Sequence, residues 1–303
     1  MMVLEKDLVL SLNRSCDYFH SKLLLFGEYA IVKGGQGLAI PFPKFKGCLK
    51  IGDLETDAKF FELYDYLKKS PLLAKRLDLK RFREDLDLGL CFDSNIPQGY
   101  GIGSSGALCA AIYSEYIIGG LPPVENSKDL KELQDYMALM ESFYHGTSSG
   151  LDCLISLIDK PVHIKDRKDV VAIKAPRFLE LGNFYLFDSD QQRKTSPLVH
   201  QFLTRFDKEQ SFQLSFKEFT KLNDLLIRDL LNLDTEALKD HFKKLSELQG
   251  DLLSDMIPPN AKDFWQKGLA SGEYYTKFCG AGGGGFFLVY STSNLNEPGL
   301  IAL

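Results

Sequence analysis

A glycine-rich segment is the first part of this sequence whose residue types could carry chemistry. Residues 97–107 read Pro-Gln-Gly-Tyr-Gly-Ile-Gly-Ser-Ser-Gly-Ala and lie between a predicted strand and a predicted helix. Glycines let backbone N–H groups turn toward an anion, and the helix that follows adds the positive end of its dipole. Ser104 and Ser105 fall in its first turn, where hydroxyl groups can bind phosphate oxygens or a metal ion. The segment therefore predicts a phosphate-binding loop, with a structural turn capped by serine as the alternative.

Two common nucleotide-binding patterns do not explain this loop. Gly101, Gly103 and Gly106 satisfy GxGxxG, but the dinucleotide-binding unit also needs a second strand that ends in an acid about 20 residues further on. Residues 121–145 offer a Pro-Pro pair and then a helix instead. A Walker loop is excluded because no lysine follows the last glycine of any run.

A second glycine run lies toward the end of the sequence. Five of the six residues from 280 to 285 are glycine, between predicted strands at 274–278 and 286–290. Each glycine costs about 0.5–1 kcal/mol of chain entropy relative to alanine, so a run of this density predicts that something approaches the backbone closely. A flexible hairpin loop is the alternative.

Four charged residues stand in apolar surroundings. Lys22 directly precedes Leu-Leu-Leu-Phe, and Glu28 follows that predicted buried strand. Lysine is seldom buried without a partner. Asp152 opens an apolar predicted helix, where the helix dipole favours an acid, whereas Glu141 falls in the last turns of the preceding helix, where the dipole opposes one. The position of Glu141 therefore predicts a nearby cation.

Predicted strands and helices supply the framework for these residues. Apolar runs and alternation predict the strands, and apolar residues at helical spacing predict the helices. The predicted strands are 22–26, 37–41, 45–51, 86–92, 161–165, 169–174, 183–187, 274–278 and 286–290. The predicted helices are 57–75, 105–118, 127–144 with Ser127 as N-cap, one that begins near 149 or 150, and several between 196 and 270. The pattern changes after Pro176, which predicts two domains, 1–178 and 179–303.

Composition excludes several classes of protein. The 303 residues include 36 Lys and Arg and 41 Asp and Glu, and the resulting charge of −5 lacks the electrostatic footprint of a nucleic-acid binder. No run of about 18 apolar residues occurs, which excludes a membrane-spanning helix. Residues 5–7 are charged where a signal peptide would be apolar, so we expect a cytoplasmic protein. The six cysteines form no CxxC pair, which predicts free buried thiols rather than a zinc site.

Three segments together resemble the motifs of the GHMP small-molecule kinases. These are 22–32, 97–107 and 277–286, which occur in the order of motifs one, two and three. Within that superfamily, Gly27-Glu28 and the segment from Glu141 to Asp152 are most similar to the mevalonate kinases. The resemblance implies an α+β fold: an N-terminal α/β domain with a left-handed βαβ unit, and a C-terminal ferredoxin-like domain.

The resemblance also implies roles for individual residues. Asp152 matches the acid that contacts the attacking hydroxyl, Lys22 matches the lysine paired with it, and Ser105 and Glu141 match the Mg²⁺ ligands. The residues that match the loop around the ATP phosphates are Pro97, Gly99, Gly101, Ile102, Gly103, Ser104, Ser105 and Gly106. The residues that match substrate-side positions are Glu28, Tyr29, Arg193, Thr195, Gly282 and Gly283.

The expected activity is ATP-dependent and Mg²⁺-dependent phosphorylation of a small-molecule hydroxyl, with mevalonate as the first substrate. Phosphomevalonate, homoserine and sugars are alternatives, as is a sensor that binds a ligand without catalysis, and a homodimer is left open. The sequence departs from the mevalonate kinases on the substrate side, where Tyr29 stands in place of their usual His and Gln192 in place of Pro. These departures concern the choice of substrate rather than phosphoryl transfer.

Overall fold

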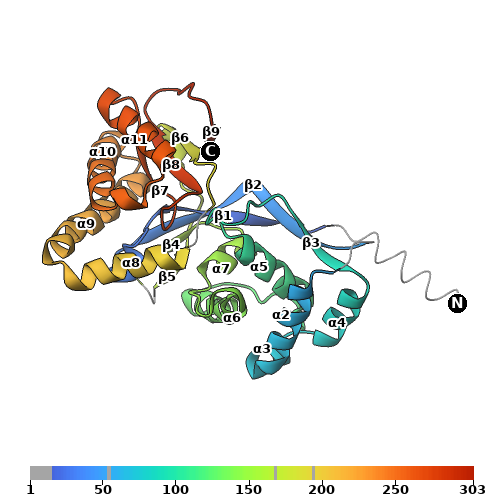
Figure 1. The fold of residues 1–303 in the computed structure, drawn as a ribbon. Helices are drawn as coiled ribbons and strands as arrows, with labels where there is room; N and C mark the ends of the chain where they lie inside the picture. Colours follow the sequence, from blue (N-terminus) through green and yellow to red (C-terminus); the bar gives the residue numbers. More distant parts are fainter. Residues whose placement is uncertain (1–15, 53–55, 167–168, 193–194) are drawn as a thin grey trace, which may run out of the picture. The chain divides into compact units, whose positions relative to one another are not determined.

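The computed structural model describes residues 16–52, 56–166, 169–192 and 195–303 and contains helices and two β-sheets (Figure 1). The chain forms two compact units. Unit 1 comprises the described residues up to Lys22, with Pro41–Ile96 and Gly103–Asp159, and unit 2 comprises Leu23–Ile40, Pro97–Ile102 and the described residues from Lys160 onward. Each unit is formed by several separate segments of the sequence. The predicted domains 1–178 and 179–303 are instead two continuous segments, and that division stays a prediction.

Unit 1 combines part of the first sheet with most of the helices that precede residue 160. The strands β1 (Phe19–Phe26) and β2 (Gly37–Ile51) run through both units, and β3 (Leu90–Ser94) pairs with the second half of β2 in antiparallel register. The helices of unit 1 are α2 (Ala58–Lys69), α3 (Pro71–Arg76), α4 (Leu79–Asp87), α5 (Ser104–Tyr116), α6 (Ser127–His145) and α7 (Leu151–Ile158). Helix α5 packs against both α6 and α7, and its alanines are fully buried because small side chains let neighbouring helices approach closely.

Unit 2 contains the second sheet. Its four strands, all antiparallel, lie in the order β7-β8-β6-β9. They are β6 (Asn183–Asp188), β7 (Tyr275–Phe278), β8 (Phe286–Ser291) and β9 (Leu300–Ala302). The short strands β4 (Val162–Ile164) and β5 (Val170–Ala172) continue the first sheet beside the start of β2. The helices of unit 2 are α8 (Thr195–Lys208), α9 (Gln210–Asn232), α10 (Thr235–Leu252) and α11 (Pro259–Ser271), and short 3-10 helices lie at Ile31–Lys33, Phe178–Glu180 and Ser254–Met256.

Prolines explain two differences from the predicted elements. The predicted helix 57–75 is divided into α2 and α3, because Pro71 has no N–H and the residue before it, Ser70, is extended. The predicted strands 37–41 and 45–51 are instead one strand, β2. Its two prolines, Pro41 and Pro43, lie between the stretch that pairs with β4 and the stretch that pairs with β3, so their missing N–H groups break neither ladder.

Capping and a tight turn explain two further differences. The N-cap of α6 is Asn126 rather than Ser127, because the Asn126 side chain accepts hydrogen bonds from the N–H groups of the first turn at 2.9 and 3.1 Å. The strand predicted from residue 86 begins at Leu90. Leu86 belongs to α4, and Gly89, with a φ of 88°, makes the turn between helix and strand.

The prediction of free thiols is wrong for two of the six cysteines. Cys16 and Cys48 form a disulfide with their Cα atoms 5.8 Å apart. Their separation of 32 residues gave no sign of pairing, because the contact depends on where the chain before β1 meets β2. The remaining four cysteines form no disulfide, and three of them, Cys109, Cys153 and Cys279, are buried.

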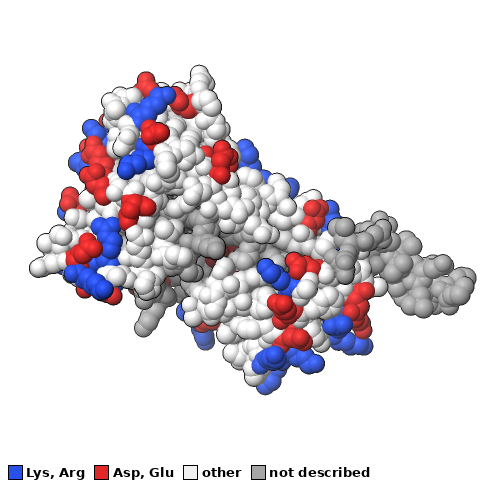
Figure 2. All heavy atoms as spheres, viewed as in Figure 1, with Lys and Arg blue, Asp and Glu red and all other residues white. Residues whose placement is uncertain are grey.

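The surface carries charges of both signs. On the face shown in Figure 2, basic and acidic side chains are interspersed over the helices rather than gathered into one broad patch of a single sign. Among the helices of the described residues, none combines the length and the apolar character needed to cross a bilayer.

Candidate active site

Lys22 and Asp152 form an ion pair inside unit 1. Lys22 lies on β1 and is buried, and its Nζ atom is 3.1 Å from Oδ1 of Asp152. Asp152 lies in the first turn of α7, where the positive end of the helix also stabilises its carboxylate. The Asp152 side chain keeps 34% of its surface exposed, so the carboxylate is held by the lysine and remains open to solvent on another side.

Two glycines let the start of α5 approach this ion pair. A Cβ atom on Gly103 would lie 3.0 Å from Lys22 Cγ, and one on Gly106 would lie 2.9 Å from Asp152 Cβ and 2.8 Å from its carbonyl carbon. A side chain at Gly106 would therefore push α5 away from α7. These glycines bring the predicted phosphate loop against the Lys22–Asp152 pair, and this packing role was not part of the sequence prediction.

The loop itself has the backbone expected of a phosphate cradle. Gly99, Gly101 and Gly103 have φ values of 78°, 72° and 83°, in the left-handed region that favours glycine. Gly103 is the N-cap of α5 and provides no side-chain cap, so the N–H groups of the first turn, which includes Ser104 and Ser105, are available to an anion. Pro97–Ile102 belong to unit 2, and the loop enters unit 1 at Gly103.

Ser105 and Glu141, the two predicted magnesium ligands, lie together in unit 1. Ser105 Oγ donates to Glu141 Oε1 at 3.4 Å and lies 3.0 Å from Nε2 of His145. The second carboxylate oxygen, Oε2, accepts a hydrogen bond from Ser148 Oγ. The sequence prediction did not assign roles to His145 and Ser148, although both lie in the segment that resembles the mevalonate kinases.

The Glu141 carboxylate is buried next to another acid. Desolvation, and then repulsion from the Asp152 carboxylate, raise the pKa of Glu141 to about 7, while the hydrogen bond from Ser148 and the charge of Lys22 act in the opposite direction. A cation near this desolvated carboxylate would stabilise its ionised form. This agrees with the cation that the position of Glu141 near the end of α6 predicts.

These residues fit a magnesium ion that is also bound by substrate phosphates. A carboxylate and a hydroxyl are hard oxygen ligands, and Mg²⁺ in nucleotide-binding sites commonly takes only one or two protein ligands. Among the described residues no group of three or more His, Cys, Asp and Glu is placed to hold a metal ion on its own.

We expect the unfolding free energy of the magnesium-free protein to fall by about 1–3 kcal/mol between pH 5 and pH 8 because of Glu141. Its folded-state pKa is raised above the usual value of 4.5 to about 7, so the folded protein holds a proton that the unfolded chain releases. The loss of unfolding free energy grows as pH rises through this interval, because Glu141 ionises in the folded protein, and it is complete above pH 8. Urea denaturation in the presence of EDTA at several pH values measures this loss.

Glu141→Gln is expected to reduce this pH dependence, since an amide does not titrate. Glu132→Gln is the matched control, because Glu132 lies on the same helix but has an exposed side chain. If the unfolding free energy falls equally with pH in the wild type and in Glu141→Gln, Glu141 is not the group responsible for the pH dependence.

Unit 2 contains a second buried lysine and acid. The Lys277 and Glu28 side chains have no exposed surface, and Lys277 Nζ donates to Glu28 Oε1 at 2.5 Å. The same ammonium donates to the carbonyls of Leu25 at 2.7 Å and Phe278 at 2.6 Å, so all three of its N–H bonds are used. Glu28, predicted on the substrate side, is thus held inside unit 2. The sequence signal that singled out Lys22, a lysine among apolar strand residues, also applies to Lys277.

The glycine run of unit 2 is approached closely by the protein's own backbone. A Cβ atom on Gly282 would lie 3.0 Å from the Met256 carbonyl oxygen, one on Gly284 would lie 2.4 Å from that of Gln191, and one on Gly285 would lie 2.7 Å from that of Tyr100. The prediction of a close backbone approach is confirmed, and the run connects the antiparallel strands β7 and β8.

Two predicted substrate-side residues are described in part or not at all. Arg193 lies outside the described residues. Thr195 is the first residue of α8, and its side chain also lies outside what the structure describes.

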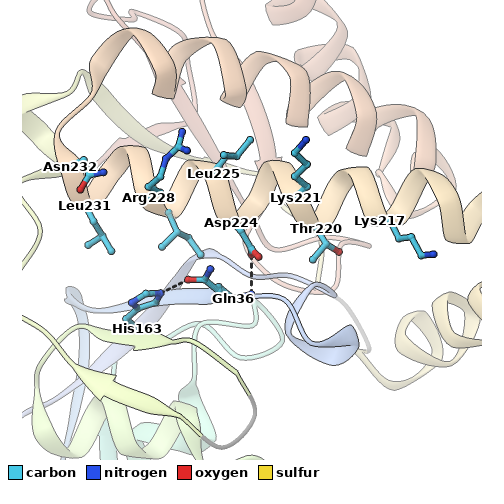
Figure 3. Close-up of a pocket in the computed structure, with 11 residues that line it drawn as sticks. Gln36, His163, Lys217, Thr220, Lys221, Asp224, Leu225, Arg228, Leu231 and Asn232 are labelled. Carbon is cyan, nitrogen blue, oxygen red and sulfur yellow. Dashed lines mark hydrogen bonds between the residues drawn. The ribbon is translucent and has the colours of Figure 1, made fainter.

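A cavity of about 680 Å³ in unit 2 lies beside α9 and does not include the predicted site (Figure 3). Within it, Gln36 N donates to Asp224 at 3.0 Å, and the Gln36 side chain lies 2.8 Å from His163 Nε2. Burial, and then the charge of Lys165, lower the pKa of His163. The polar groups near the strands therefore bind one another, and we assign no reaction to this cavity.

The sequence is similar to one family model and to one curated protein. Residues 65–160 match the family model described as GHMP kinases N terminal domain. A curated relative, the bifunctional fucokinase/GDP-fucose pyrophosphorylase of Arabidopsis thaliana, is 26% identical over 246 residues, which are 76% of this chain and 22% of that protein. The chain therefore spans about a fifth of the length of the curated relative that it matches.

Solved structures share the fold over almost the whole chain. A mevalonate kinase of L. major in complex with R-mevalonate is 17% identical, with a TM-score of 0.63 and coverage of 94% of this chain and 89% of that one. A phosphomevalonate kinase of Streptococcus pneumoniae in complex with phosphomevalonate and AMPPNP is 17% identical, with a TM-score of 0.60 and coverage of 93% of each chain. Residues 65–160 therefore match the N-terminal domain of the GHMP kinases, and the chain has the fold of these solved kinases, which agrees with the resemblance of its three motifs.

Proposed function

We propose that this protein transfers the γ-phosphoryl group of ATP to a hydroxyl group of a small molecule, with mevalonate as the first candidate. The observation that carries the proposal is the Lys22–Asp152 ion pair of 3.1 Å, against which the first turn of α5 packs through Gly103 and Gly106. A charged pair beside a helix N-terminus is suited to reactions of anionic phosphates.

In this proposal Asp152 acts at the attacking hydroxyl. Its Oδ1 atom is held by Lys22, and the exposed part of its carboxylate accepts the hydrogen bond of the substrate hydroxyl, orients that oxygen and takes its proton. The Lys22 ammonium offsets negative charge on the carboxylate and on the transferred group. Because phosphoryl transfer proceeds through a loose transition state, positioning and charge stabilisation are the main tasks of the protein.

The first turn of α5 binds the ATP phosphates through backbone N–H groups and the serine hydroxyls. Ser105 and Glu141 would hold Mg²⁺, which supplies neutralisation of the β- and γ-phosphate charges when it is bound. The AMPPNP bound by the S. pneumoniae phosphomevalonate kinase supports ATP as the phosphoryl donor.

The identity of the alcohol rests on the motifs and the relatives. The resemblance of residues 141–152 to the mevalonate kinases, together with the similar fold of the L. major enzyme, favours mevalonate. The fucokinase relative makes a sugar hydroxyl the second candidate.

A coupled assay of ADP release tests the proposal. Mevalonate, phosphomevalonate, homoserine and fucose are each supplied with ATP and Mg²⁺, and we expect the highest kcat/KM with mevalonate. ADP release with another alcohol and none with mevalonate would overturn the substrate assignment. ATP binding without ADP release on any of them would identify a ligand sensor instead of a kinase.

A further inference from the structure

Tyr29 is a buried residue with a strained backbone. Its φ is 58°, in the left-handed region, and only 5% of its surface is exposed. A tyrosine in this region costs conformational free energy that glycine would avoid, so the surrounding contacts must hold it there. Its hydrogen bonds to Met256 and Ala281 and its ring contact with Phe202 lie within unit 2, in segments far apart in the sequence.

The phenol and the ring of Tyr29 bind two different elements. Tyr29 Oη donates a hydrogen bond of 2.7 Å to the carbonyl oxygen of Ala281, in the glycine run, and lies 3.4 Å from the Met256 sulfur. The ring stacks on Phe202 of α8, with the ring centroids 4.4 Å apart and the planes inclined by 27°. Tyr29 thus joins the glycine run to α8.

Helix α8 also contacts the glycine run directly. A Cβ atom on Gly283 would lie 2.6 Å from Leu198 Cδ1, a side chain one turn before Phe202. The backbone of the run is anchored at other points, since Gly283 N donates to the Met256 carbonyl at 2.6 Å and Gly285 N donates to that of Gln191 at 2.7 Å. The carbonyl of Ala281 lies at the start of the run, and a side chain, that of Tyr29, holds it.

We propose that Tyr29 is a positioning residue for the alcohol substrate. Its phenol fixes the glycine run against α8, and it raises the affinity for the alcohol without touching it. This inference rests on the proposed function, and it uses the motif resemblance, which assigns Gly282, Gly283 and Thr195, the first residue of α8, to the substrate side. It replaces the direct substrate contact that the motif resemblance implies for Tyr29.

Tyr29→Phe tests the inference because it removes the phenol oxygen and keeps the ring that stacks on Phe202. We expect KM for the alcohol to rise about fivefold, the usual effect of losing one buried hydrogen bond. We expect kcat and the KM for ATP to stay near the wild-type values. Faster amide hydrogen exchange in residues 280–285 is the second expected result, and it does not depend on activity.

Tyr290→Phe is the matched control. Tyr290 is also a buried tyrosine of unit 2, and its Oη donates to a backbone carbonyl, that of Leu181, at 2.9 Å. Tyr290→Phe also loses a hydrogen bond from a buried phenol to a backbone carbonyl, but this bond does not involve residues 280–285. We therefore expect no change in the KM for the alcohol or in the amide hydrogen exchange of residues 280–285. Phe202→Leu is a second variant, which removes the stacking partner, keeps the phenol, and is expected to raise the KM for the alcohol as well.

Equal effects of Tyr29→Phe and Tyr290→Phe on KM would overturn the inference, as would unchanged exchange of residues 280–285 in Tyr29→Phe. If the wild-type protein phosphorylates no alcohol, the proposed function fails, while the exchange experiment still decides whether Tyr29 holds the glycine run. The two failures are therefore distinguishable.

Discussion

Replacing Asp152 with asparagine is expected to lower kcat for phosphoryl transfer by about 10²–10⁴-fold, the usual contribution of a positioned general base. The amide keeps the size of the side chain, but it cannot take a proton from the substrate hydroxyl, and it loses the ion pair with Lys22. ATP binding is expected to persist, because the N–H groups of α5 are unchanged. The measurements are ADP release at saturating substrate and calorimetric titration with ATP.

Asp159→Asn is the matched control for this variant. Asp159 follows the last residue of the same helix, α7, and its carboxylate lies 2.7 Å from His20 Nδ1 in an exposed pair. Its φ of 49° suits asparagine, which tolerates the left-handed region. We expect near wild-type kcat for the control. Near wild-type kcat for Asp152→Asn would remove Asp152 from the mechanism, both as a base and as an orienting group.

Replacing Lys277 with methionine is expected to lower the free energy of unfolding by about 3–5 kcal/mol, the usual cost of removing one partner of a buried ion pair. The change removes the Lys277 ammonium from the Glu28 carboxylate, whose side chain has no exposed surface. It also removes a donor from two backbone carbonyls, those of Leu25 and Phe278. Urea denaturation monitored by circular dichroism measures the loss.

Two further variants test whether the buried charge of Glu28 causes the loss of stability expected for Lys277→Met. The double variant Lys277→Met/Glu28→Met is expected to be more stable than Lys277→Met alone, because it removes the buried carboxylate together with the lysine that binds it. Lys267→Met is the control. Lys267 forms an exposed pair with Glu297 at 2.8 Å, so its loss is expected to cost at most about 1 kcal/mol. A double variant less stable than Lys277→Met would show that the carboxylate is not the cause.

Much of the local structure could be predicted from the sequence. The glycine loop before α5, the apolar helix that Asp152 opens, and the strands on either side of residues 280–285 lie close to where the residue patterns placed them. These features depend on neighbours in the chain, through helical spacing, strand alternation and turn residues. The errors also have local causes, such as the cap at Asn126 and the break at Pro71.

The environment of the candidate site could be predicted only in part. The need for a partner at Lys22 and for a cation near Glu141 followed from charge and apolar surroundings. The raised pKa of Glu141 did not, because it depends on desolvation and on the distance to Asp152. The Cys16–Cys48 disulfide was missed for a similar reason, since spacing alone does not tell which cysteines meet.

The sequence by itself determined the resemblance to the GHMP kinases, the order of the motifs and the residue types proposed for phosphoryl transfer. The motif resemblance implied that Lys22 pairs with Asp152, and the structure gives the distance of 3.1 Å between them. Only the tertiary structure decided that Lys277 meets Glu28, across 249 residues of sequence. It also decided what fills the space beside the glycines of residues 280–285, namely backbone from distant segments of unit 2. The physical reason is that burial and ion pairing depend on distances in space, which residues far apart in the chain acquire only when the fold brings them together.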